Sequence, residues 1–215
     1  METNIAVFVG PSLPNAQKYL SNHIDIVFNG PAIRGDLTKA ANDGFKTILL
    51  IDGVFGTALA VDNFEIRTVL DCGVSLYGCS SMGVLRAVDT EELGMQGFGW
   101  VFSHFKNSVI TYEDDLALLY DEREFTNITI PNINLIYTLK EYESDIEKIR
   151  MISKYSRKLS WKYRTQHLLR ELLANYYSKS KATEIVEFCV VNGNIKKIDA
   201  INTINAMKAM ENGKD

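Results

Sequence analysis

The stretch "LYGCSSMGVLRA", residues 76–87, decides the fold that we expect for this chain. Strand-like apolar sequence stops at Gly78, and helix-like sequence begins within the next few residues. A strand that passes through small residues into a helix is typical of a parallel α/β sheet. The turn also carries a thiol and two hydroxyls, at the sheet edge where such folds bind ligands.

The sequence before this stretch repeats the same strand–turn–helix step. Strand-like segments that end in glycine occupy residues 4–10, 24–30, 47–53 and 74–78, and helix-like segments occupy residues 14–23, 35–44, 62–73 and 80–89. In the third helix, Asp62 is the expected N-cap and Gly73 the residue just past the end. The pattern predicts an α/β fold with a parallel sheet flanked by helices. Its active edge would be formed by the loops at Gly10, Gly30, Gly53 and Gly78.

The last third of the chain has a helical pattern from about residue 139 onward. Helical segments are predicted over residues 139–156, 161–179, 182–193 and 197–212. We therefore expect an α/β core over residues 1–130 and a helical C-terminal layer or subdomain over residues 131–215, packed on the core. The Lys/Arg-rich segment 154–170 fits a solvated face or a partner-binding patch.

Composition narrows the class of protein. The chain has 215 residues, 46% of them hydrophobic and 23% charged, with a net charge of -4. We expect no nucleic-acid partner because there is no overall basic charge, and no membrane span because every apolar run falls short of ~18 residues. Neither the cysteines nor the histidines have the spacing of a metal site, so no metal or cofactor is expected. The cysteine pattern also indicates a reducing, cytoplasmic location.

The turn at residues 79–83 has the form small-x-Ser-x-Gly, which resembles a nucleophile elbow. The following helix would offer free N–H groups to an anion. Alternatively, Ser80 or Ser81 only caps the helix. Cys79 is a rival nucleophile, since a thiol at a helix N-terminus can ionise, or else a small core residue.

Charged residues near the predicted edge extend this candidate site. They are Arg34 after the second strand, Asp52 after the third, Glu65 in the first turn of the third helix, and Arg86 in the fourth helix. Each has a structural alternative, such as a cap or a surface position. His104 is the one histidine in a plausible region, and it stands among aromatic residues, so a Ser-His-Asp hydrolase is not supported.

Several motifs occur in a defined order: "VFVGPSL", "PAIRGDL", "LLIDGVF", "FEIRTVLDCGVSLYGCSSMGVLRAVD", "GMQGFG" and "EDDLAL". Together they resemble the TfuA-like family over about residues 7–120. The positions that match the family pattern are Arg34, Gly35, Asp36, Asp52, Gly53, Glu65, Ser81, Met82, Gly83, Arg86, Gly94, Met95, Asp114 and Asp115. The chain departs from the pattern at Asp89 and Leu116, where the family has glutamate, and at Tyr120, where histidine is frequent.

The resemblance implies a function. TfuA-like proteins accompany YcaO enzymes, which use ATP to activate a peptide backbone amide and often install a thioamide. Known settings are ribosomal peptide natural products (RiPP biosynthesis) and the thioglycine of methyl-coenzyme M reductase. The resemblance implies that the protein hydrolyses the thiocarboxylate of a ubiquitin-like sulfur-carrier protein and so delivers sulfide. The alternative is a non-catalytic adaptor that recruits or activates YcaO.

The resemblance and the local chemistry together suggest roles for individual residues. The expected catalytic residues are Ser81, Asp52, Arg86 and Glu65, and the expected substrate-binding residues are Arg34, Gly53, Ser80 and Gly83. Thiocarboxylate hydrolysis needs a nucleophile or activated water, an oxyanion site and a cation for the substrate's charge. Ser81, Cys79 and water remain alternatives for the attacking group.

Overall fold

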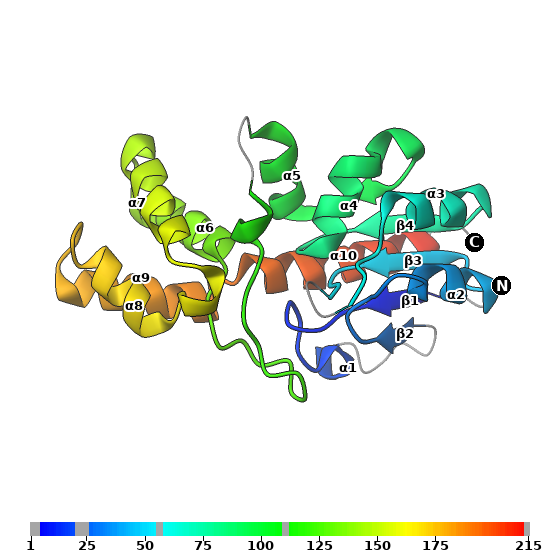
Figure 1. The fold of residues 1–215 in the computed structure, drawn as a ribbon, viewed down its shortest axis with the longest axis horizontal. Coiled ribbons are helices and arrows are strands. Elements are labelled where there is room, and N and C mark those ends of the chain that lie inside the picture. The colour runs from blue at the N-terminus through cyan, green and yellow to red at the C-terminus, as the bar shows by residue number, and fades with distance from the viewer. Residues whose placement is uncertain (1–4, 20–25, 55–57, 109–111, 213–215) are drawn as a thin grey trace. The chain divides into compact units, whose positions relative to one another are not determined.

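The computed structural model describes residues 5–19, 26–54, 58–108 and 112–212, and the chain forms two compact units (Figure 1). Unit 1 combines Met1–Val109 with Lys196–Asp215, and unit 2 is Ile110–Ile195. The domain division after residue 130 stays a prediction. The boundaries between the compact units follow residues 109 and 195. The last helix belongs to unit 1 because it contributes side chains to the α/β core.

Unit 1 contains a five-stranded parallel sheet in the order β2-β1-β3-β4-β5. The strands are β1 Ile5–Phe8, β2 Ile26–Asn29, β3 Thr47–Leu50, β4 Ser75–Gly78 and β5 Gln96–Gly97. The predicted α/β fold with a parallel sheet and helices is confirmed. The two-residue β5 was not predicted, because it lies in the glycine-rich "GMQGFG", which has no apolar run.

The helices of unit 1 follow the predicted alternation with strands. They are α1 Ala16–Tyr19, α2 Asp36–Asn42, α3 Asn63–Asp71, α4 Met82–Thr90, the short 3-10 helix η1 Glu91–Leu93, α5 Gly99–Asn107 and α10 Ile195–Asn212, whose first residue belongs to unit 2. The capping of α3 is as expected. The Asp62 carboxylate accepts a hydrogen bond from the Glu65 N–H at 2.8 Å, and Gly73 has a φ of 78°. Residues 20–23 of the expected first helix lie outside the described residues.

The sheet is buried on both faces. Val7 and Leu49 belong to a core cluster that includes Ala200 and Ile204 of α10. Ile48, next to Leu49 in β3, points to the opposite face and is fully buried as well. Contacts of α4 with β3 and β4 cover the sheet there. Burial on both faces explains why the third strand reads as a continuous apolar run.

The strand order creates a switch point at the carboxyl ends of β1 and β3. The chain leaves β1 toward β2 on one side, and the later strands β3, β4 and β5 lie on the other side. In open parallel sheets, ligands bind in the crevice at such a reversal. The loops that follow β1, β3 and β4 are therefore the expected location of a functional site.

Unit 2 is helical, as predicted, although its first helix begins earlier than residue 139. It contains η2 Glu113–Asp115, α6 Asn132–Tyr142, α7 Ile146–Lys158, η3 Trp161–Tyr163, α8 Gln166–Leu173 and α9 Lys179–Val191. The expected helix over residues 139–156 is interrupted, because Asp145 caps a new helix by accepting hydrogen bonds from two backbone N–H groups. Leu139, Ile152 and Ile185 share one buried apolar cluster. Across the described ranges, no helix has the length and apolarity to cross a bilayer.

Candidate functional site

Asp52, directly after β3, organises the loop that follows β1. One carboxylate oxygen accepts hydrogen bonds from the N–H groups of Gly10 and Ser12, at 2.8 and 2.9 Å. The other accepts the Ser12 hydroxyl at 2.6 Å. The side chain is almost completely buried. Asp52 therefore holds two loops together at the switch point, and both of its oxygens already have donors.

The turn between β4 and α4 is tied to α10 by Ser80. This serine has a φ of 64°, a left-handed conformation that is unusual for a residue other than glycine. Its hydroxyl donates a 2.7 Å hydrogen bond to the Lys196 carbonyl and lies 3.4 Å from the Cys79 sulfur. Because Ser80 is fully buried and its hydroxyl is bonded, it has a structural task at the predicted site.

Ser81 differs from Ser80 in its hydrogen bonding. It occupies the N-cap position of α4, yet its side chain makes no capping hydrogen bond. In the part of the chain that the structure describes, its hydroxyl has no hydrogen-bond partner. The nearby N–H of Gly83 donates to the Ile51 carbonyl. Ser81 is therefore placed at the N-cap as expected, but its hydroxyl is not used to cap the helix.

The glycines around this turn permit a close approach of backbone segments. A Cβ atom on Gly83 would lie 1.8 Å from the Leu50 carbonyl oxygen, and one on Gly78 would lie 2.1 Å from the Gly83 oxygen. A Cβ on Gly53 would lie 2.8 Å from Cγ of Met82. Because these glycines have no side chain, α4 can pack closely against β3 and β4. Gly53 and Gly83 were expected to contact substrate, and that role stays a prediction.

Lys196, in the first turn of α10, is a buried cation that the sequence did not reveal. Its side chain is only 2% exposed. Burial lowers the pKa of its ammonium to about 8, while the nearby Asp52 charge acts in the opposite direction. No pattern separates Lys196 from its neighbour Lys197 in "NIKKIDA", so sequence reasoning had no signal for it.

Cys79 lies in the same buried region. Desolvation raises the pKa of its thiol to about 12, against weaker opposing hydrogen bonds from Ser80 and Thr203. The side chain is completely buried in the core cluster beneath the sheet edge. A neutral thiol in this position is a poor nucleophile, so the structure favours the core role for Cys79.

Asp199 of α10 is a second buried carboxylate that sequence reasoning missed. Its oxygens accept hydrogen bonds from the N–H groups of Trp100 and Val101, at 3.0 and 2.8 Å, and so cap the start of α5. Desolvation raises its pKa to about 6, in opposition to these two hydrogen bonds. Through Lys196 and Asp199, α10 supplies one cation and one acid beside the residues of the predicted edge.

Glu65 and Arg34 are brought together at the start of α2 rather than at the Ser81 turn. The Glu65 carboxylate accepts hydrogen bonds from the N–H groups of Gly35, Leu37 and Thr38, at 2.9, 3.0 and 3.1 Å. It therefore supplies the N-terminal acceptor that α2 lacks in its own sequence. The half-exposed Arg34 pairs with Asp62 at 2.9 Å.

Arg86 fastens α4 to the segment before α3. Its Nε donates to the Val61 carbonyl at 2.7 Å, and one Nη donates to the Asp89 carboxylate at 2.9 Å. The side chain is mostly buried. Its carboxylate partner is thus on its own helix. A role for Arg86 toward a substrate anion stays a prediction.

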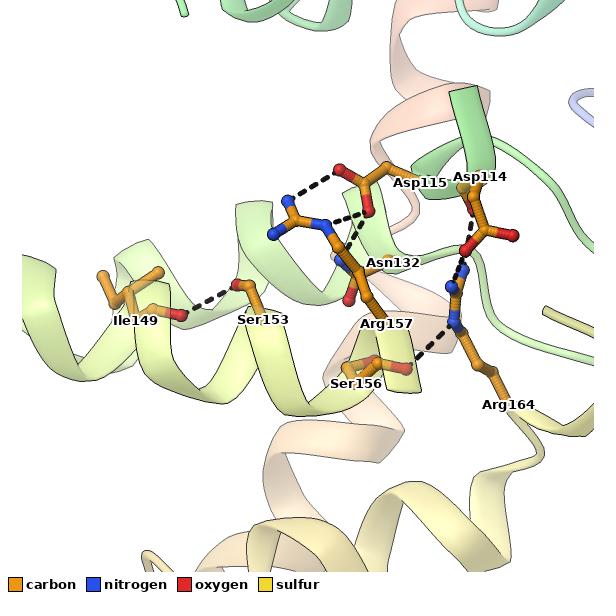
Figure 2. Close-up of polar contacts among 8 residues, drawn as sticks. All are labelled: Asp114, Asp115, Asn132, Ile149, Ser153, Ser156, Arg157 and Arg164. Carbon is orange, nitrogen blue, oxygen red and sulfur yellow. Dashed lines mark hydrogen bonds and ion pairs between the residues drawn. The ribbon is translucent and has the colours of Figure 1, made fainter. Parts of the chain in front are cut away.

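The paired acids of "EDDLAL" lie in unit 2, where they anchor two arginines (Figure 2). Asp115 is buried and accepts two hydrogen bonds from the Arg157 guanidinium, each at 2.8 Å, and one from Asn132 at 2.7 Å. The completely buried Arg164 donates to the carboxylate and the carbonyl of Asp114. These acids join η2 to α7 and to the segment before α8.

Comparison with known proteins adds one finding. A sequence model of the family described as TfuA-like protein matches residues 52–165, more than half of the chain. The chain belongs to the TfuA-like family. The match reaches beyond residue 120, where the resemblance seen in the motifs stops, and so includes Arg157 and Arg164. No curated protein matches the chain. Membership of the TfuA-like family supports a role associated with peptide thioamidation.

The predicted site residues of this TfuA-like protein fall into two groups. Asp52, Ser80 and Ser81 follow β3 and β4 at the carboxyl edge, with Lys196 beside them. Glu65, Arg34 and Arg86 are bonded to the segments around α2 and α3. Within the described ranges, no group of three or more His, Cys, Asp or Glu side chains is arranged to hold a metal ion. The chemistry available at the edge is that of the Ser81 hydroxyl and the buried Lys196 amine.

Proposed function

We propose that this TfuA-like protein hydrolyses the C-terminal thiocarboxylate of a ubiquitin-like sulfur-carrier protein and delivers sulfide to a YcaO enzyme. The observation that carries the proposal is the Ser81 hydroxyl, which stands at the β4–α4 turn without a partner among the described residues. Family membership supplies the thioamidation setting. A reducing cytoplasm suits both the thiocarboxylate and Cys72, an exposed free thiol.

The proposed reaction consumes one water molecule. The Ser81 oxygen attacks the thiocarboxylate carbon and its proton passes to a base, which gives that proton to the sulfur as the carbon–sulfur bond breaks and hydrosulfide leaves. Water then cleaves the serine ester, which yields a carboxylate, restores the Ser81 hydroxyl and releases one proton to solvent. If Ser81 instead positions water, the same bonds break without an ester.

Among the groups at the edge, Lys196 is best suited to accept the proton. Its buried amine has a pKa of about 8, which allows a substantial neutral fraction near physiological pH. The oxygens of Asp52 already accept three hydrogen bonds, and those of Glu65 accept three others. We therefore propose that Asp52 positions the loops of the site, that Glu65 holds the start of α2, and that Lys196 acts on Ser81 or on water.

The adaptor function is the second candidate, and a specific observation favours it. The polar side chains of the edge are buried: Ser80 is 0% exposed, Asp52 2% and Ser81 6%. A site with so little exposed surface suits a rigid scaffold that recruits or activates YcaO. On this alternative, the charged residues shared with the family would stabilise the fold.

Incubation of the purified chain with thiocarboxylated carrier, in the absence of YcaO, separates the two functions. Intact-mass spectrometry follows the loss of thiocarboxylate, and a sulfide-sensitive probe follows the released sulfur. We expect catalytic conversion of carrier to its carboxylate form. If the carrier stays thiocarboxylated while YcaO activity still depends on this chain, the hydrolase function is wrong and the adaptor function is supported.

A further inference from the structure

Unit 2 carries a basic segment that the proposed hydrolysis does not use. Residues 148–170 contain eight lysines and arginines and no aspartate or glutamate. Some of these cations form ion pairs with carboxylates that lie outside the segment. Arg157 pairs with Asp115 and Arg164 with Asp114, as Figure 2 shows.

Three lysines of this segment have no such carboxylate. Lys154, Lys158 and Lys162 are exposed, and within the described residues none of them forms an ion pair. The Lys158 ammonium lies 4.6 Å from the centre of the Tyr155 ring, and the Lys162 ammonium lies 5.2 Å from the centre of the Trp161 ring. Two of the three lysines thus lie over the rings of neighbouring aromatic residues.

The α7 part of this surface is one continuous helix face. Met151, Lys154, Tyr155 and Lys158 stand at positions i, i+3, i+4 and i+7, and all are exposed. Met151 and Tyr155 are 42% and 43% exposed, so this helix face places large apolar side chains beside lysines. The 3-10 helix η3 begins three residues after the end of α7, and it carries the exposed Lys162 and Tyr163, the latter 63% exposed. We call these six residues the basic–aromatic face.

We propose that the basic–aromatic face binds an acidic, partly apolar polypeptide segment of a partner protein. Carboxylates of that segment would neutralise the three lysines. Its apolar side chains would cover Met151, Tyr155 and Tyr163. Tyrosine and methionine are enriched at protein–protein interfaces, and tyrosine contributes a large contact area at a small entropic cost.

A nucleic acid suits the face less well. Phosphate recognition favours arginine, and the arginines at 157 and 164 are engaged by internal carboxylates. The chain as a whole has a net charge of -4, which repels a polyanion at longer range. Three lysines arranged around exposed tyrosines match a short acidic peptide better. Binding at this face would be independent of the proposed hydrolysis.

The test uses the full chain and a fluorescein-labelled 14-residue peptide of glutamate and leucine, followed by fluorescence anisotropy. We expect saturable binding that weakens as salt rises. The double variant Lys154→Glu/Lys158→Glu should bind at least about tenfold more weakly, because two attractive charges become repulsive. The control variant Lys140→Glu/Lys179→Glu changes two other exposed lysines of unit 2 and produces the same net charge. It should bind within about twofold of the unmodified chain.

Each remaining outcome contradicts the proposal. If both double variants weakened peptide binding equally, with unchanged far-ultraviolet circular dichroism, the binding would depend on the net charge of the chain and not on this face. Equal binding of a peptide with glutamine in place of glutamate would remove the charge complementarity. A 14-nucleotide single-stranded RNA that binds more tightly than the acidic peptide would assign the face to nucleic acid. Absence of peptide binding at about 1 mM in low salt would mean that the face is only solvated.

Discussion

The substitution Glu65→Gln separates a positioning role from a catalytic one. The Glu65 carboxylate accepts three N–H groups at the start of α2, two on one oxygen and one on the other. A glutamine has nearly the same shape, but it carries no charge and keeps a single acceptor oxygen. If that oxygen faces Leu37 and Thr38, the amide NH₂ group is left against the N–H of Gly35.

The expected destabilisation follows from these lost interactions. One hydrogen bond to a charged acceptor contributes roughly 1.5–3 kcal/mol, and a negative charge at a helix N-terminus contributes about 0.3–1 kcal/mol. Glu65→Gln should therefore lower the free energy of unfolding by about 2–4 kcal/mol. For a chain of this size, that loss corresponds to a melting temperature lower by roughly 5–15 °C.

Thermal unfolding followed by circular dichroism measures this effect, with Glu92→Gln, at an exposed position, as the matched control. Hydrolysis of the thiocarboxylated carrier is then compared well below both melting temperatures. The folded Glu65→Gln protein should keep most of its activity. An unchanged melting temperature together with a hundredfold loss of hydrolysis would refute this reasoning and identify Glu65 as a catalytic group.

Other predictions test the core of unit 1. Gly83→Ala should destabilise the chain by more than about 3 kcal/mol, since its Cβ would lie 1.8 Å from the Leu50 oxygen; an unchanged melting temperature would contradict the tight turn. Because burial lowers the Lys196 pKa from 10.5 to about 8, the unfolded chain binds more protons between these pH values, and stability should rise across that window by up to roughly 3 kcal/mol. Lys196→Met should remove this rise in denaturant titrations. In native protein at pH 8, iodoacetamide should label the exposed Cys72 and leave the buried Cys79 intact, as peptide mass spectrometry would show.

Local sequence signals predicted the sheet and its edge. Four apolar segments that end in glycine gave the first four strands, and the pair of Asp62 and Gly73 gave the limits of α3. These features depend on neighbouring residues, so they can be recognised in a single sequence. The same holds for the turn at Ser81, where a strand, two hydroxyls and a glycine stand together.

Contacts between distant segments were not predictable in this way. Lys196 is buried beside Asp52 only because α10 returns to the sheet, and its neighbour Lys197 has the same side chain. Glu65 was expected to be a catalytic residue, yet its oxygens accept hydrogen bonds from N–H groups about 30 residues away in the sequence. Such long-range pairing determines which polar groups form structural hydrogen bonds and which remain available for chemistry.

The most direct test of the central claim compares Ser81→Ala with Ser80→Ala in carrier hydrolysis. The two serines are adjacent, but of the two only the Ser80 hydroxyl donates a buried hydrogen bond, to the Lys196 carbonyl. Ser80→Ala should therefore lower the melting temperature, at a cost of about 1–3 kcal/mol.

Ser81→Ala should leave the melting temperature nearly unchanged, because in the described residues its hydroxyl has no partner. It should lower the rate of thiocarboxylate hydrolysis by about a hundredfold or more, as expected for the loss of a nucleophile or of the group that positions water. Hydrolysis by Ser81→Ala at the rate of the unmodified chain would contradict the account and leave the adaptor function as the better description.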